Sequence, residues 1–370
     1  MRPTLQIAYQ FPEPIMQTRS RKVFMLNFPG PGVAMLPITC RKFGSTSAKQ
    51  PSGHGLKYLL GAIFAGYSYY QYDNYARNRE LARRLDMPIH RILLYKAVPF
   101  GPLSVVAGYC ASVPIPSFLR RPLYSAFASA YGCNLNDSKF ALHEYPTFGA
   151  FFSRPLRTGA RSIATVDGLV SPSDGTLLHC GSIGVQEGAL IFPEQVKGSL
   201  YSLSELIGDT ACAEFRQRLS AGSSVYYCTI YLGPGDYHRF HAPARMSVVR
   251  TEKMPGEALS VAPWLMRRIP KLLCMNQRVS LQCRWKYGQL CYVPVGAANV
   301  GSIVLNDSKP DPSVAVAPGH ELGRFELGST VVLVFEGPEK LCWKKVIGER
   351  CRMGDVLIEA PKRPWWNTWQ

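Results

Sequence analysis

The chain is short of acidic residues. It has 25 Asp and Glu against 42 Lys and Arg, which gives a formal net charge of +17. None of its 11 cysteines forms a CxxC pair, so neither a zinc site nor a disulfide ladder is indicated. We expect these cysteines to be reduced and mostly buried. There is no internal repeat, coiled-coil heptad or nucleotide-binding glycine loop, and no motif links the basic charge to nucleic acid, so no nucleic-acid partner is expected.

Charged residues are also few, at 18%, whereas hydrophobic residues make up 46%. This balance predicts a packed globular body rather than disorder, and 370 residues suffice for one large domain with attachments or for two domains. The positive charge begins in residues 1–54, where seven Lys and Arg face a single acid, Glu13. A basic, acid-poor leader predicts a mitochondrial transit peptide, and the alternative is a disordered basic tail.

Long apolar runs are scarce, and the best one follows the leader. Residues 58–72 in "GLKYLLGAIFAGYSYYQYDNY" carry no charge. As a helix they span roughly 22 Å at 1.5 Å per residue, which is less than the ~30 Å hydrocarbon core of a bilayer. Lys57 can extend the span by reaching to the interface, and the tyrosines resemble an interfacial belt. We predict a single membrane helix over residues 55–73, with a surface or buried helix as the alternative.

Residues 74–145 have a helical pattern that mixes apolar faces with arginine. Basic amphipathic segments of this kind lie on anionic membrane surfaces or serve as core helices, and the sequence does not separate the two. We interpret the region as helical and membrane-associated. The stretch "PWLMRRIPKLL" (263–273) has the same ambiguity, as a lipid contact or a core helix.

Beyond residue 160 the pattern changes to short β-rich runs separated by Gly, Pro and Asp. The clearest runs are at 223–232, 288–305 and 329–336. This spacing predicts an α+β protein whose main part, residues 146–328, is an antiparallel, barrel-like β body, with residues 329–370 belonging to the same body.

Two loops in this body carry candidate catalytic side chains. In "VSPSDGTLLHCG" (170–181) Asp174 precedes a glycine after an apolar run, and Asp-Gly by itself is an ordinary hairpin turn. In "LGPGDYHRFHAP" (232–243) His238 and His241 lie three residues apart in a chain with only seven histidines. They could chelate a metal or bond loop carbonyls, but no third metal ligand is evident, so a catalytic site is favoured.

A third segment supplies a nucleophile. In "FELGSTVVLVFE" (325–336) Ser329 follows Gly328, whose lack of a side chain leaves its carbonyl open to attack. An Asp, a His and a Ser on separate loops of one body make the parts of a nucleophile, a base and an orienting carboxylate.

Together these motifs resemble the mitochondrial phosphatidylserine decarboxylases. The likeness runs from about residue 90 to residue 358, and the basic leader and the predicted membrane helix agree in kind. Two departures are a short connection between Ile303 and Gly319 and a terse tail after Ile358, and neither touches the motif residues. Further segments carry the resemblance, namely "VKGSLYSLSELIG", "PGEALSVAP", "NQRVSL" and "VGAANVGSI".

The resemblance implies that the chain cuts itself between Gly328 and Ser329. Asp174 would orient His241, which would take the proton from Ser329 as its oxygen attacks the Gly328 carbonyl. Elimination would leave a β chain ending at Gly328 and an α chain whose first residue becomes a covalent pyruvoyl group, the only cofactor implied. A Schiff base between this group and phosphatidylserine would release CO2 and give phosphatidylethanolamine. His238 is our candidate donor of the returning proton.

The resemblance also implies partners and a location. The substrate is phosphatidylserine held in an anionic phospholipid surface, and the two products of self-cleavage stay together as an α–β heterodimer. The expected place is the mitochondrial inner membrane, with one span and the catalytic body facing the intermembrane space. Two rival readings are a serine hydrolase acting on another molecule and a non-catalytic membrane-anchored scaffold. No Gly-x-Ser-x-Gly elbow surrounds Ser329, which counts against the hydrolase, and the intact Asp, His and Ser count against the scaffold.

Overall fold

The fold is described from a computed structural model of the chain. The described residues are 54–84, 88–90, 93, 100–186, 189–193, 200–269, 271–297, 303–307, 311–326 and 328–360. The predicted leader therefore lies outside them, except for His54, as does the tail after residue 360. The chain divides into two compact units, residues 1–63 and 64–370, and the contacts discussed below lie within the second.

Helix α1 (His54–Arg84) contains the segment predicted to cross a membrane, but it continues into a charged stretch. Ion pairs between Arg77 and Asp73 and between Arg83 and Glu80 lie on its exposed surface. Among the described helices, none is long and apolar enough to span a bilayer. The membrane helix predicted over residues 55–73 is therefore not supported, because too short a part of this helix is free of charged and polar residues.

The helices that follow pack around aromatic side chains. They are α3 (Phe100–Ser112), α4 (Ser117–Tyr131), the 3-10 turn Leu142–Glu144 and α5 (Phe148–Phe152). Helix α4 starts after Pro116 and stops at Gly132, whose φ of +67° ends the helix in the left-handed conformation that glycine adopts without strain. Tyr124 of α4 stacks on Phe151 of α5 with ring centroids 4.5 Å apart. This stacking joins the helices to the loop that leads into the β body.

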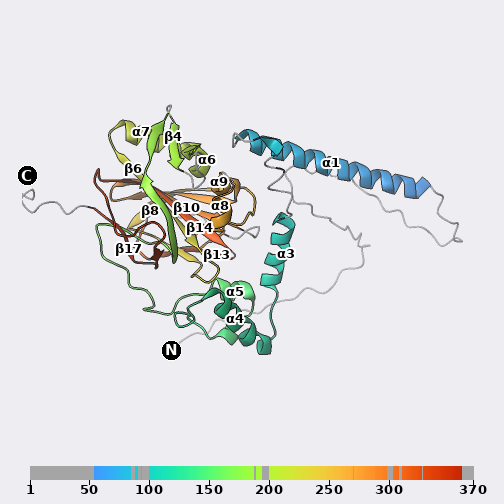
Figure 1. Cartoon of the computed structure of the whole chain (residues 1–370), viewed down its shortest axis with the longest axis horizontal. Coiled ribbons are helices and arrows are strands. Elements are labelled where there is room, and N and C mark those ends of the chain that lie inside the picture. The colour runs from blue at the N-terminus through green and yellow to red at the C-terminus, as the bar shows by residue number, and fades with distance from the viewer. Residues whose placement is uncertain are drawn as a thin grey trace, which may run out of the picture. The chain divides into compact units, whose positions relative to one another are not determined.

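The β body is built on an open eight-stranded antiparallel sheet (Figure 1). Its strand order is β12-β8-β9-β10-β14-β6-β2-β16. The antiparallel body is confirmed, but the barrel-like closure is wrong. The edge strands β12 (Ala315–Val316) and β16 (Arg350–Cys351) are two residues long and do not pair with each other in the described part of the chain. Edges this short offer too few backbone groups to close the sheet.

The remaining elements surround this sheet. Its inner strands are β8 (Met246–Met254), β9 (Arg278–Trp285), β10 (Gly288–Gly296), β14 (Ser329–Gly337), β6 (Ser224–Leu232) and β2 (Gly175–Ser182). The small sheets are β1 (Gly168–Val170), β17 (Val356–Glu359) and β15 (Cys342–Trp343); β11 (Ile303–Leu305), β13 (Glu321–Phe325) and β7 (Arg239–His241); and β3 (Gly184–Gln186), β4 (Ala189–Pro193) and β5 (Leu200–Ser202). The helices of the body are α6 (Leu203–Ile207), α7 (Asp209–Ser220), α8 (Pro263–Met266) and α9 (Leu272–Met275).

Strand β14 lies inside the sheet, between β10 and β6, and is apolar on both faces. Val332 and Val334 join the cluster that packs against α6, α7 and α9, whereas Leu333 and Phe335 join the cluster on the other face. Alternate residues of a strand point to opposite faces, so an unbroken apolar run is what a doubly covered strand requires. Each such side chain contributes roughly 1.5–3 kcal/mol by burial. The strand that Ser329 begins is therefore held on all sides.

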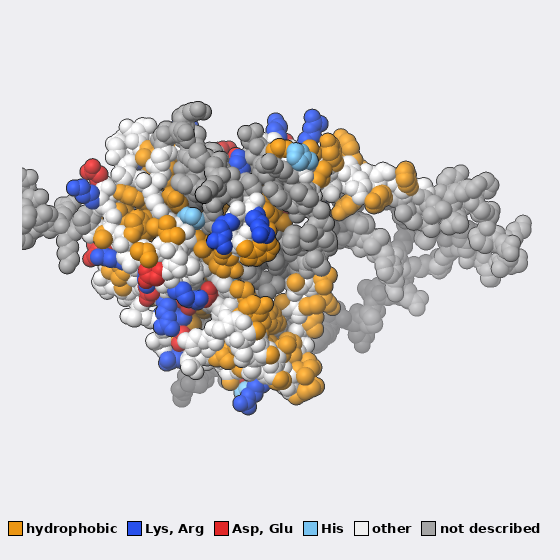
Figure 2. All heavy atoms as spheres, viewed as in Figure 1, with side chains coloured by type: hydrophobic (Ala, Val, Ile, Leu, Met, Phe, Trp, Pro, Cys, Tyr) orange, Lys and Arg blue, Asp and Glu red, His pale blue; other side chains and the backbone are white. Residues whose placement is uncertain are grey.

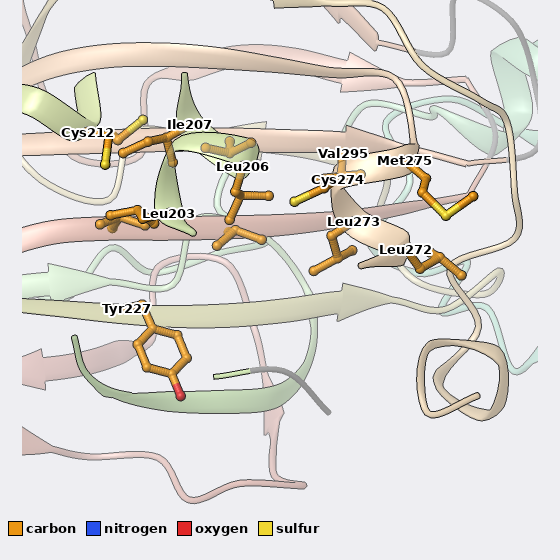
Figure 3. Packing of buried hydrophobic residues seen from close by; sticks show 14 of the residues in the cluster. Leu203, Leu206, Ile207, Cys212, Tyr227, Leu272, Leu273, Cys274, Met275 and Val295 are labelled. Atoms are coloured by element: carbon orange, nitrogen blue, oxygen red, sulfur yellow. The ribbon is translucent and has the colours of Figure 1, made fainter. Parts of the chain in front are cut away.

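The segment 263–273 belongs mainly to the core. Leu272 and Leu273 of α9 are buried in the cluster to which α6 also contributes (Figure 3), and Met266 is buried as well. Trp264 remains exposed, with the guanidinium of Arg268 over its ring. The core-helix alternative thus holds for most of the segment. The ten cysteines in the described residues are all free thiols, and six of them are buried, as expected for small hydrophobic side chains.

Candidate active site

Ser329 is the first residue of β14 and is fully buried. It pairs with Leu232 of β6 on one side and Gly296 of β10 on the other. Its Oγ has no hydrogen-bond partner among the described residues. Gly328 before it has a φ of +43°, and a Cβ there would lie 3.2 Å from the Cβ of Ala297. The backbone conformation therefore favours glycine, a side chain there would also contact Ala297 tightly, and the buried hydroxyl lies directly after it.

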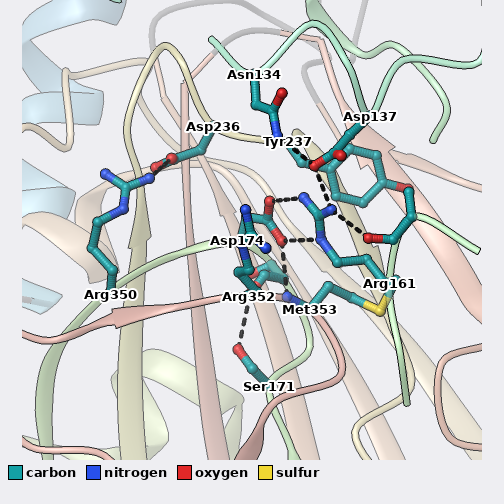
Figure 4. A network of polar contacts seen from close by, with 12 residues as sticks. Asn134, Asp137, Arg161, Ser171, Asp174, Asp236, Tyr237, Arg350, Arg352 and Met353 are labelled. Carbon is teal, nitrogen blue, oxygen red and sulfur yellow. Dashed lines mark hydrogen bonds and ion pairs between the residues drawn. The ribbon is translucent and has the colours of Figure 1, made fainter. Parts of the chain in front are cut away.

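Asp174 lies in the loop between β1 and β2, where a buried arginine holds it (Figure 4). Arg161 donates from Nη2 to Oδ2 at 2.5 Å and from Nε to Oδ1 at 3.1 Å. Oδ1 also accepts from the backbone N–H of Met353 at 2.8 Å. Arg161 Nη1 donates to Asp137 at 2.6 Å. Burial by itself lowers the pKa of Arg161, but the hydrogen bonds and charges of Asp174 and Asp137 raise it well above its ordinary value. The arginine therefore stays charged between two carboxylates.

His241 is fixed at both ring nitrogens. Nδ1 lies 2.9 Å from the carbonyl oxygen of Gly319, and Nε2 lies 2.9 Å from the hydroxyl of Tyr237. Because a carbonyl oxygen only accepts, Nδ1 carries the proton and Nε2 accepts from Tyr237. Burial lowers the pKa of His241, and the hydrogen bond to Gly319 opposes this to a smaller extent. The ring is therefore a neutral base whose single lone pair is engaged.

His238 is completely buried, with one ring nitrogen bound and one free. Its Nδ1 donates to the Asp236 carbonyl at 2.9 Å, whereas Nε2 has no partner among the described residues. The ring packs against Phe152, with centroids 4.0 Å apart. Burial, opposed by the hydrogen bond to Asp236 and assisted by the charge of Arg154, lowers the pKa of His238 to about 3. At neutral pH it is therefore an uncharged imidazole, which cannot donate a proton from Nε2 until that nitrogen has gained one.

Backbone hydrogen bonds bring the three motifs together. The N–H of His241 donates to the Pro172 carbonyl at 2.8 Å, which joins β7 to the loop that carries Asp174. On the other side β7 pairs with β13, where Glu321 is opposite His241. The N–H of Phe325 donates to the His238 carbonyl at 2.8 Å, three residues before Gly328. Strand β7 thus lies between the aspartate loop and the segment that leads to Ser329.

The side chains themselves are not linked as the expected relay. Asp174 is bound to Arg161 rather than to His241, His241 is bound to Tyr237 rather than to Ser329, and Ser329 Oγ has no partner among the described residues. Sequence reasoning missed both Arg161 and Tyr237. Tyr237 stands in the quoted Asp-Tyr-His segment, but nothing in one sequence indicates which tyrosine contacts a histidine. Arg161 is 13 residues before Asp174 and belongs to no recognisable motif.

A cavity of about 500 Å³ lies beside this arrangement. Its lining includes Ala111 of α3, Ser153, Arg239, Arg324 and Glu326, so it reaches from the helices to within three residues of Ser329. Arg239 is paired with Glu321 at 2.9 Å, whereas Arg324 has no ion pair in the described part of the chain. Charged side chains line both sides, since Glu144 belongs to the 3-10 turn before α5 and Arg324 belongs to β13. No group of three potential metal ligands is found among the described residues.

The comparisons with known proteins agree on one family. A family model for phosphatidylserine decarboxylase matches residues 148–359, which include all the motif residues. The chain belongs to the phosphatidylserine decarboxylase family. Membership makes it a carboxy-lyase, an enzyme that releases CO2 from its substrate.

The relatives cover most of the chain. A mitochondrial phosphatidylserine decarboxylase proenzyme of Pongo abelii is 36% identical over 344 residues, with 81% of this chain and 83% of the relative covered. A protein with the same name from Caenorhabditis elegans is 36% identical and matches 72% of this chain. A mitochondrial phosphatidylserine decarboxylase proenzyme 1 from Saccharomyces cerevisiae is 28% identical and matches 71% of this chain. In both cases the match includes 73% of the relative's own length. The similarity thus extends from the catalytic motifs into the helical region before them.

Proposed function

We propose that the chain decarboxylates phosphatidylserine to phosphatidylethanolamine after cutting itself between Gly328 and Ser329. One observation carries the proposal. A fully buried serine hydroxyl without a partner in the described residues directly follows a glycine with φ of +43°, on a strand that pairs with β6, the strand before the histidine motif. A buried hydroxyl left unpaired costs free energy, so its retention favours a chemical role.

Self-cleavage uses the chain's own groups. Ser329 Oγ attacks the Gly328 carbonyl and transfers its proton to Nε2 of His241, so that the peptide bond becomes an ester and the amide nitrogen becomes a free amine. Elimination across Cα and Cβ of Ser329 breaks the ester and leaves Gly328 with a carboxylate. Hydrolysis of the resulting dehydroalanine releases ammonia. General base catalysis of this kind contributes on the order of 10²–10⁴ in rate.

The residues around Ser329 fit the pyruvoyl group that results. This group supplies a ketone that condenses with the substrate amine and withdraws electrons as CO2 departs. Pairing of β14 with β6 and β10 fixes the first residue of the new α chain, because Ser329 lies opposite Leu232 on one side and Gly296 on the other. Burial on both faces keeps α and β chains together after the cut, since β14 lies inside the sheet. Low polarity around the site also favours loss of a charged carboxylate.

His238 is placed to move a proton between substrate atoms. Its Nε2 has no partner among the described residues and is the ring atom free to carry a proton. Burial, as the main cause, lowers the pKa of His238 to about 3, so a ring that has gained a proton during the reaction is a strong acid and readily gives it to the substrate carbon. The predicted role as proton donor therefore requires an earlier step in which the same nitrogen is the acceptor.

The helices before the body support work at a lipid surface. Side chains on α3 and α4 are exposed although they are large and apolar, among them Tyr109 at 71% and Phe118 at 76% (Figure 2). Exposed apolar side chains beside Arg121 suit an anionic bilayer surface. The relatives' names place them in mitochondria. We therefore include in the proposal the inner membrane, with the catalytic body on its intermembrane-space side.

Intact mass of the purified chain tests the proposal. We expect two polypeptides, and the smaller one should be the 42 residues from 329 to 370. Its mass should be lower than that of the serine-starting peptide by one ammonia. Ser329→Ala should give one uncut chain without decarboxylase activity, because no nucleophile remains. Thr330→Val is the matched control, since it removes the neighbouring buried hydroxyl and should still cleave. An uncut wild-type chain that decarboxylates phosphatidylserine would refute the proposal.

A further inference from the structure

The hydroxyl of Tyr237 lies on the nitrogen that self-cleavage needs. Tyr237 is four residues before His241, is only 4% exposed, and contacts Nε2 at 2.9 Å. We propose that Tyr237 sets the rate of self-cleavage by holding the lone pair of His241, which must exchange this tyrosine for Ser329 before the chain can cut itself. The inference rests on the self-cleavage proposed above and identifies a positioning residue for it.

The direction of the hydrogen bond follows from the other side of the ring. Gly319 offers only a carbonyl oxygen to Nδ1, so that nitrogen must carry the proton and the neutral ring has one lone pair, on Nε2. Tyr237 therefore donates. Burial, together with the negative charge of Glu321, raises the pKa of Tyr237, so its proton stays in place as a donor. The only acceptor position on the His241 ring is therefore already occupied by the hydroxyl of Tyr237.

One lone pair cannot serve two hydroxyls. While Tyr237 donates to Nε2, the proton of Ser329 has no acceptor there, which agrees with the unpaired state of Ser329 Oγ among the described residues. The exchange also moves a hydrogen bond from one buried hydroxyl to another, so the number of bonds stays the same. The cost of exchange is therefore mainly that of breaking the Tyr237 bond before the Ser329 bond forms.

Several charges face His241 from the elements packed against it. Glu321 of β13 and Asp174 of the aspartate loop raise its pKa, whereas Arg239 of its own strand lowers it. Arg161, which binds Asp174, adds a positive charge near Tyr237. These groups are unchanged when Tyr237 loses its hydroxyl, so a change in the pH profile reports the removed hydrogen bond.

Tyr237→Phe tests the inference. The full chain is made by translation in vitro, and conversion of precursor to the two products is timed on gels across a range of pH. At neutral pH we expect faster cleavage, by roughly two- to tenfold, the factor that corresponds to the net strength of one hydrogen bond. Tyr226→Phe is the matched control, because it also removes a mostly buried tyrosine hydroxyl, one that donates to the carbonyls of Pro338 and Glu339 away from His241.

The pH profile separates this role from a structural one. Donation to Nε2 favours the neutral ring, so the hydrogen bond lowers the pKa of His241. Without it the ring is protonated at a higher pH, and the acidic limb of the cleavage profile should move toward higher pH. A loss of packing alone would slow cleavage without moving the limb. Slower or unchanged cleavage by Tyr237→Phe with an unmoved limb would overturn the inference.

A graded substitution keeps the test valid if the phenylalanine variant folds poorly. Replacing Tyr237 with a ring-fluorinated tyrosine keeps its shape but makes the hydroxyl a stronger donor to Nε2. Cleavage should then slow as the number of fluorines rises, and an unchanged rate would overturn the inference. Failure here is distinct from failure of the proposed function. If wild type cleaves and Ser329→Ala does not, the self-cleavage proposal survives even when Tyr237 proves not to limit it.

Discussion

The central sheet and the helices before it treat large apolar side chains in opposite ways. From residue 329 to residue 336, β14 has every residue buried. On α4, by contrast, Phe118 is 76% exposed and Leu123 is 47% exposed. Both segments are rich in hydrophobic residues, so composition alone does not distinguish them. The sheet uses its apolar residues to hold itself together, whereas α4 leaves many of its own at the surface.

In our proposal, this difference separates two roles: the sheet holds the groups for self-cleavage, and the helices before it contact lipid. The groups proposed for self-cleavage need low polarity and fixed positions, and the sheet supplies both by covering the two faces of β14. The lipid contact that we propose needs apolar side chains that can leave water, and α3 and α4 expose such side chains. The cavity is lined by residues of α3 on one side and of β7 and β13 on the other.

The largest expected loss of stability comes from truncating a large side chain in the core of the sheet. Phe335→Ala should destabilise the protein by roughly 3–5 kcal/mol, because it removes buried surface and leaves a cavity beside Trp285 and Tyr226. Denaturant unfolding monitored by circular dichroism measures this. A cost below about 1 kcal/mol would contradict the view that the sheet relies on this side chain.

A somewhat smaller effect is expected at the buried ion pairs of the site. Arg161→Gln leaves Asp174 and Asp137 without their cation and should cost roughly 3 kcal/mol, since breaking a buried pair leaves unpaired charge. We also expect slower self-cleavage, because Asp174 loses the group that positions it. The matched control is Arg83→Gln on α1, whose pair with Glu80 is exposed and whose loss should leave the melting temperature unchanged. Equal losses of stability in the two variants would remove the distinction between the regions.

The smallest expected change in stability is on the helices. Phe118→Ser should alter the free energy of unfolding by no more than about 0.5 kcal/mol, because the side chain is exposed. Binding to vesicles that contain phosphatidylserine should nevertheless fall roughly tenfold, as expected if the ring enters the bilayer. Vesicle flotation measures the binding, and gel analysis should show normal self-cleavage. Unchanged flotation would show that this part of α4 does not contact lipid.

Local pattern was enough to predict several strands. The runs predicted at 223–232 and 329–336 correspond to β6 and β14, and the start of the run at 288–305 corresponds to β10. A strand is specified by side chains that follow one another in the chain, so its signal is local. The convergence of the motifs was expected from their resemblance to a family, and the backbone bonds of β7 now show how their segments meet.

One prediction failed where long-range geometry decides, and a second is not supported for a local reason. Closure of the sheet depends on whether its edge strands meet, and β12 and β16 are too short to do so. The membrane helix was predicted from a short uncharged stretch, but helix α1 extends it with charged residues, and none of the described helices can cross a bilayer.

The sequence by itself determined which residues we propose for the chemistry, because the Gly328-Ser329 bond, the histidine pair and Asp174 were singled out by residue type, by order and by resemblance to a family. Only the tertiary structure decided what those groups contact, with Arg161 on Asp174 and Tyr237 on His241. The reason is physical. A hydrogen bond depends on distances of a few tenths of an ångström between residues brought together by sheet register, and no local pattern in the chain encodes those distances.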